Sequence, residues 1–129
     1  MRRSRVAPPK GRWTVDAYAT ESGERPVWAF IQGLEGRNKG EAIALVKLLE
    51  EQGNQLRRPQ SGPLGEGLFE LRGKEVRIFF VFVPGRTIVL RDGETKRRDD
   101  IPKRTLERLR KLQADAMRRV AARGRQETR

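Results

Sequence analysis

Two arginines stand close together in a stretch that otherwise has the pattern of β-strands. The stretch, residues 68–80, reads Leu-Phe-Glu-Leu-Arg-Gly-Lys-Glu-Val-Arg-Ile-Phe-Phe and contains Arg72 and Arg77. Lys96 and Arg97 follow the next apolar run. Guanidinium and ammonium groups bind phosphate and stabilise charge that develops on it in a transition state. Because RNA carries its own nucleophile, the 2′-hydroxyl, such cations could serve a site that cleaves RNA.

The residue types that are missing narrow the chemistry further. The chain of 129 residues has no histidine and no cysteine. A Ser-His-Asp triad, an imidazole base, a thiolate nucleophile and a metal held by histidine or cysteine are therefore excluded. We expect no cofactor and no metal. A crowd of cations can lower the pKa of a lysine enough for that lysine to carry a proton.

The charge of the chain is strongly basic and unevenly distributed. There are 29 lysines and arginines against 17 acidic residues, a net charge of +12, and residues 91–129 hold 14 basic and 7 acidic residues, a net of +7. Such asymmetry indicates a polyanionic partner, nucleic acid first and an acidic protein second. The plain alternative is an arginine-rich solvated surface. No apolar run approaches the length of a membrane span, so we expect a cytoplasmic protein and no membrane contact.

Hydrophobic periodicity predicts one α+β domain over residues 12–122. It lies between a disordered basic N-terminus, residues 1–11, and a frayed basic tail, residues 123–129. Strands are expected at 13–19, 68–71, 76–83 and 87–91, and helices at 26–33, 37–52 and from about 102 to Gly124. The proline- and glycine-rich residues 55–67 have the composition of a loop, and residues 93–100 are expected to leave the sheet. The predicted fold is a small antiparallel sheet, a three-strand meander plus the N-terminal strand, packed by an α-hairpin and a C-terminal helix.

Alternation along residues 76–83 divides this strand into two faces. Val76, Ile78 and Phe80 share one face with Phe82, and Arg77 shares the other with Phe79. If the helices cover the fully apolar face, the other face is partly open to solvent. Arg77 then lies beside Arg72, with the cations of residues 96–98 nearby, and Phe79 could stack on a base.

Each of these residues also has an ordinary structural interpretation. An arginine in a strand is more often ion-paired or solvated at the surface, and Phe79 could belong to the edge of the core. Arg72 could pair with Glu70 or Glu75. The cations at 96–98 could form a solvated corner balanced by the two aspartates that follow them.

Several motifs together resemble the HigB-like, phage-derived branch of the RelE toxin superfamily. They are Leu-Phe-Glu-Leu-Arg at 68–72, Val-Arg-Ile-Phe-Phe-Val-Phe at 76–82, Ile-Val-Leu at 88–90, and the spacing from Gly93 through Lys96 and Arg97 to Pro102 before a basic helix. Trp-Thr-Val at 13–15 and the helix that begins Pro26-Val27 fit the same pattern. The resemblance covers about residues 13–118.

The resemblance implies a RelE-like toxin of a type II toxin–antitoxin system. Such toxins are endoribonucleases that cut mRNA on the ribosome by 2′-hydroxyl attack, and their partner is a cognate antitoxin, commonly a helix-turn-helix protein. The family's catalytic positions fall on Arg72 and Arg77, which would hold the scissile phosphate, and on Lys96 and Arg97, which would hold the backbone and share proton transfer. Glu70 is a possible base but ranks below a structural partner of Arg72. Further RNA contacts are expected from Lys74, Arg98, Lys103, Arg104 and Phe79.

Two positions depart from the family pattern. Glu94 stands where an aromatic residue is usual, and Ile101 stands where threonine usually precedes the proline. Glu94 places a negative charge where RNA should lie. This favours the alternative function, a non-catalytic basic module with a RelE-like fold that binds nucleic acid or a host protein.

Overall fold

The computed structural model describes residues 12–95 and 101–127, so the expected disordered segment at 1–11 lies outside the described part. The elements, in chain order, are β1 (Thr14–Ala17), α1 (Pro26–Gln32), α2 (Gly36–Gln52), the 3-10 turn η1 (Gly53–Gln55), β2 (Ser61–Gly65), β3 (Leu68–Arg72), β4 (Val76–Val83), β5 (Thr87–Thr95) and α3 (Lys103–Glu127). The α+β class is confirmed. In the described part of the chain, no helix has the length and apolar character that crossing a bilayer requires.

The five strands form one mixed sheet in the order β1-β5-β4-β3-β2. The meander of β3, β4 and β5 is antiparallel, as predicted. Two features of the prediction are wrong. The N-terminal strand β1 pairs with β5 in parallel, and β2 forms an antiparallel edge strand from residues that were expected to be a loop.

A bulge interrupts the pairing of β4 with β5. Phe80 lies opposite Leu90, but the next pair is Phe79 with Asp92, so Arg91 is the extra residue. Because side chains alternate along a strand, one extra residue exchanges the two faces of the strand beyond it. The outer part of β5 therefore turns Asp92 and Glu94 toward the face that holds Phe79. The strand also runs to Thr95, beyond the point where the chain was expected to leave the sheet.

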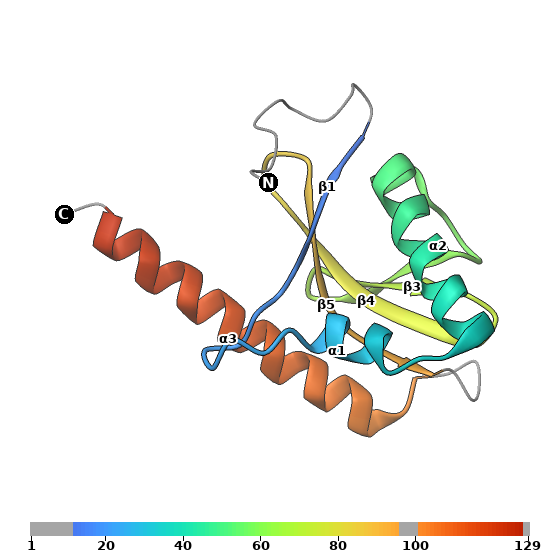
Figure 1. Cartoon of the computed structure of the whole chain (residues 1–129). Coiled ribbons are helices and arrows are strands. Elements are labelled where there is room, and N and C mark those ends of the chain that lie inside the picture. The colour runs from blue at the N-terminus through green and yellow to red at the C-terminus, as the bar shows by residue number, and fades with distance from the viewer. Residues whose placement is uncertain (1–11, 96–100, 128–129) are drawn as a thin grey trace, which may run out of the picture.

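Helices cover both faces of the sheet (Figure 1). On one face, α1 and α2 pack over Ile78 and Phe80 in the larger core. On the other face, Leu109 of α3 is fully buried against Phe79 and Val81. The predicted division of β4 into two faces is confirmed, but the expectation that one face is open is wrong where α3 covers it.

Local sequence accounts for the start of α1 and the end of α2. Pro26 opens α1, where its missing N–H costs nothing. Gly53 ends α2 with a positive φ of 49°, and the Trp13 ring lies so close that a Cβ there would come within 2.1 Å of it. The last helix was expected to stop at Gly124, but α3 continues to Glu127 and projects past the strands (Figure 1).

Candidate functional site

Arg72 and Arg77 face each other in the sheet. Arg72 at the end of β3 is the direct cross-strand partner of Arg77 on β4, and Arg77 is the partner of Glu94 on β5. Like charges directly opposite each other destabilise a sheet unless opposite charges compensate them. Here compensation comes from Glu94 and from Glu70 on β3.

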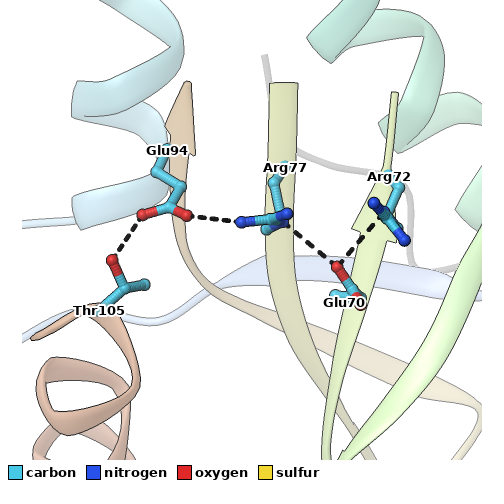
Figure 2. A network of polar contacts seen from close by, with 5 residues as sticks. All are labelled: Glu70, Arg72, Arg77, Glu94 and Thr105. Atoms are coloured by element: carbon cyan, nitrogen blue, oxygen red, sulfur yellow. Dashed lines mark hydrogen bonds and ion pairs between the residues drawn. The ribbon is translucent and has the colours of Figure 1, made fainter. Parts of the chain in front are cut away.

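Arg77 lies at the centre of a buried polar network (Figure 2). Its side chain is 1% exposed. Its Nη1 donates to Glu94 Oε2 at 2.9 Å, and its Nε lies 3.2 Å from Glu70 Oε1. A buried cation requires this kind of pairing, because an unpaired charge in the interior costs several kcal/mol or more.

The two carboxylates extend the network to both sides. Glu70 Oε1 also lies 3.7 Å from Nε of Arg72, which makes Glu70 the structural partner that the sequence suggested. Glu94 Oε1 accepts a hydrogen bond of 2.7 Å from the Thr105 hydroxyl in the first turn of α3. The network therefore joins three strands to the start of the last helix.

Two expectations about exposure are wrong. Arg77 was expected on a solvent-reachable face, and Phe79 was expected to be able to stack on a base, but Phe79 is 0% exposed beneath α3. Both residues lie on the predicted face. The face is closed because α3 packs on it and because the bulge turns Glu94 toward Arg77. Sequence reasoning missed Thr105, and Glu94 was recognised only as a departure from the family pattern.

Other predicted cations surround the end of the sheet where this network lies. Arg72 keeps a side-chain exposure of 21%. Lys74, in the turn between β3 and β4, is exposed, and so are Lys103 and Arg104 at the start of α3. The pairing of β3, β4 and β5 and the bond from α3 to Glu94 bring these segments to one end of the sheet (Figure 1).

Three further predicted residues, Lys96, Arg97 and Arg98, lie outside the described residues. The described site holds two arginines and two glutamates, which balance in formal charge. Within residues 12–95 and 101–127, no three carboxylates gather as a metal site would need. Arg72 is the more exposed of the two arginines in the network.

Comparison with known proteins places the chain in a family. Residues 29–114 match the family described as Phage derived protein Gp49-like (DUF891), which is two thirds of the sequence. The chain belongs to this Gp49-like family. This match agrees with the sequence motifs, which also resemble a phage-derived family. No curated protein matches the Gp49-like chain.

Among solved structures, the Gp49-like chain is similar to a chain in the toxin–antitoxin complex RelBE2 from Mycobacterium tuberculosis. The identity is 16%, the TM-score is 0.48, and the alignment covers 69% of this chain and 97% of the other.

A second polar cluster fastens α3 of the Gp49-like chain to the sheet. The Tyr18 hydroxyl donates to Asp115 Oδ2, and Arg91 Nε donates to Gln113 Oε1 at 2.9 Å. The Arg91 guanidinium also lies 5.1 Å from the centroid of the Tyr18 ring. Burial lowers the pKa of Arg91, an effect that Tyr18 opposes, and arginine remains a cation at neutral pH. Nearer the start of the helix, Arg108 Nε donates to Asp92 Oδ2 at 2.9 Å.

Proposed function

We propose that this Gp49-like chain is the toxin of a type II toxin–antitoxin system, from the HigB-like branch, and that it is an endoribonuclease that cuts ribosome-bound mRNA. The observation that carries the proposal is the meeting of Arg72 with Arg77 at one end of the sheet, where the exposed Lys74, Lys103 and Arg104 also gather. The net charge of +12 favours a polyanionic substrate.

In the proposed reaction the nucleophile belongs to the RNA. The 2′-oxygen attacks the adjacent phosphorus, the bond to the 5′-oxygen breaks, and the leaving oxygen takes a proton as a 2′,3′-cyclic phosphate forms. Arg72 donates hydrogen bonds to the phosphate oxygens as their charge grows. Lys96 and Arg97 hold the backbone and exchange the protons, the roles that the family resemblance implies.

Arg77 takes a different role from the one the sequence suggested. Because its guanidinium is buried between Glu70 and Glu94, it acts as a positioning residue that fixes Glu70 beside Arg72. RNA on either side of the cut is held by Lys74, Arg98, Lys103 and Arg104. The cognate antitoxin, a helix-turn-helix protein in this proposal, blocks this activity in the cytoplasm.

A second function deserves a test because one observation favours it. Glu70 and Glu94 neutralise Arg77 and lie where an RNA backbone would approach, which suits a basic module that binds RNA or a host protein without cutting. For such a module, neutralising about six phosphates makes affinity fall by roughly three decades between 50 and 200 mM salt.

Mapping of mRNA 5′ ends after brief expression without an antitoxin separates the two functions. The endonuclease produces new 5′ ends in translated regions within minutes. Arg72→Ala should lower the cleavage rate about a hundredfold, the usual cost of losing a donor to a transition-state oxyanion. Arg37→Ala, on the exposed surface of α2, is the matched control and should leave cleavage unchanged.

Two results would contradict the proposal. Growth arrest without new 5′ ends, together with salt-sensitive RNA binding, would support the non-catalytic module. Equal cleavage by the Arg72→Ala variant and the wild type would remove Arg72 from the chemistry. Arg77→Ala is a poor test, since it leaves the buried Glu70 and the partly exposed Glu94 without their shared cation.

A further inference from the structure

A hollow of about 660 Å³ opens at the β2 side of the sheet, on the face that carries α1 and α2. Its floor contains the rings of Phe69 and Phe82, both partly exposed. Its walls come from Leu56, just after η1, and from the β2 residues Ser61 and Gly62. The hollow therefore forms between the end of α2 and the edge strand that the sequence did not predict.

The floor of the hollow is a fixed aromatic surface. The Phe69 and Phe82 rings meet edge to face with their centroids 5.1 Å apart. The centroids of the Trp13 and Phe82 rings are 5.4 Å apart. Arg86 in turn lies 4.6 Å from the centroid of the Trp13 ring. Aromatic pairs in these arrangements hold one another in place, so the floor is ready to receive an apolar group without rearrangement.

The rim of the hollow is cationic. The Arg57 Nη1 donates to the carbonyl oxygens of Asn54 and Leu56 at 2.6 and 3.0 Å, which fixes its guanidinium in place. The Arg58 guanidinium lies over Gly62, so close that a Cβ on this glycine would come within 2.7 Å of Cζ. None of the ten residues that line the hollow is acidic. In the described part of the chain, no carboxylate lies within ion-pair distance of Arg57 or Arg58.

We infer that this hollow binds an acidic segment of a partner protein, with one large apolar side chain packed on Phe69 and Phe82 and flanking carboxylates on Arg57 and Arg58. An apolar floor with a cationic rim matches that combination, because the inserted side chain supplies buried area and the carboxylates supply charge-assisted hydrogen bonds. The proposal is independent of the endonuclease function and goes beyond it.

Charge and polarity argue against three other occupants. The chain's own residues 1–11 carry four basic and no acidic residues, so the rim repels them. A second copy of the chain brings another +12 and is repelled in the same way. A nucleobase would bury its polar edges against a mostly apolar lining, where Asn54 and Ser61 are the only polar side chains besides the two arginines.

The test uses the full chain and labelled peptides, measured by fluorescence anisotropy. Three heptapeptides carry Leu, Phe or Trp at the centre, with three Asp or Glu residues on each side. One matched peptide has Ser at the centre, and another has Asn and Gln in place of the acids. We expect at least one of the first three to bind at least tenfold more tightly than both matched peptides.

Charge reversal on the protein locates the binding. Arg58→Glu should lower the affinity for the tightest-binding peptide at least tenfold. Arg37→Glu makes the same change in charge and should change the affinity for that peptide less than twofold. Arg37 lies in the first turn of α2, about 24 Å along this helix from Gly53 at the hollow. Both arginines are exposed, so both variants should fold, as a circular dichroism spectrum would verify.

Three outcomes would overturn the inference. The apolar anchor fails if the Ser peptide binds as tightly as the others. The location fails if Arg58→Glu and Arg37→Glu weaken binding equally, since the effect is then one of net charge. The partner is not an acidic segment if none of the acidic peptides binds and Arg58→Glu instead selectively lowers the affinity for a single-stranded RNA of 12 nucleotides.

Discussion

Replacing Arg77 by methionine tests whether this arginine is primarily structural. Methionine keeps an unbranched apolar stem in place of the arginine stem and leaves Glu70 and Glu94 in place without their shared cation. Breaking a buried ion pair from one side typically costs about 3–5 kcal/mol. Glu94 is 18% exposed and keeps its hydrogen bond from Thr105, so the lower end of that range, about 3 kcal/mol, is expected.

Urea denaturation followed by circular dichroism measures this loss. The free energy of unfolding should fall by about 3 kcal/mol with an unchanged m-value, a large share of the roughly 5–15 kcal/mol that stabilises a domain. Arg37→Met, which removes an exposed arginine, should stay within about 0.5 kcal/mol of wild type. The triple variant Arg77→Met, Glu70→Leu, Glu94→Leu should recover most of the loss, because apolar replacement of a whole buried pair is often neutral.

The structural role of Arg77 is refuted if the free energy of unfolding of Arg77→Met lies within about 1 kcal/mol of wild type, since the loss of a paired and fully buried guanidinium should cost more than that. It also fails if the triple variant is less stable than Arg77→Met alone. That result would mean that the two carboxylates are stabilising without the arginine.

Three smaller perturbations test other contacts. Thr105→Val removes the hydrogen bond to Glu94 and should lower the free energy of unfolding by about 1–2 kcal/mol in the same urea assay. A change within experimental error would contradict a structural role for this hydrogen bond. Gly53→Ala drives a Cβ into the Trp13 ring at a positive φ and should cost at least about 2 kcal/mol, so a neutral effect on Tm would contradict the close contact. Tyr18→Phe removes the hydrogen bond to Asp115 of α3 and should speed amide hydrogen exchange in the second half of α3 while the sheet stays protected. Unchanged exchange would show that this hydrogen bond does not hold the helix against the sheet.

Much of the fold followed from residue patterns alone. The alternation in β4 gave the correct faces, and the start of α1 at Pro26 followed from the chemistry of proline. The strand β2 was missed because Ser61–Gly65 holds two glycines and a proline and has no alternation, so only pairing with β3 makes it a strand. The parallel direction of β1 depends on partners far along the chain, which no local pattern encodes.

The sequence correctly placed Arg72 beside Arg77, but it did not predict the ion pair between Arg77 and Glu94. If the pairing of β4 with β5 continued from the turn without a bulge, Gly93 would lie opposite Arg77 and Glu94 would point toward α1 and α2. The extra residue Arg91 shifts the register and brings Glu94 opposite Arg77 instead. No residue type in this strand marks the position of the bulge. The ion pair between Glu94 and Arg77 therefore could not be predicted from the sequence.

The parallel pairing of β1 with β5 has a consequence for how the polypeptide is made. Thr14 leaves the ribosome early, yet the residue it pairs with, Thr87, is synthesised only after the whole of β4. Adjacent strands such as β3 and β4 can close over a short turn, whereas β1 must wait for a distant neighbour, and such non-local pairing slows folding. A nascent chain that has not yet reached β5 therefore carries an N-terminal strand with no place in the sheet, and the finished fold is assembled late.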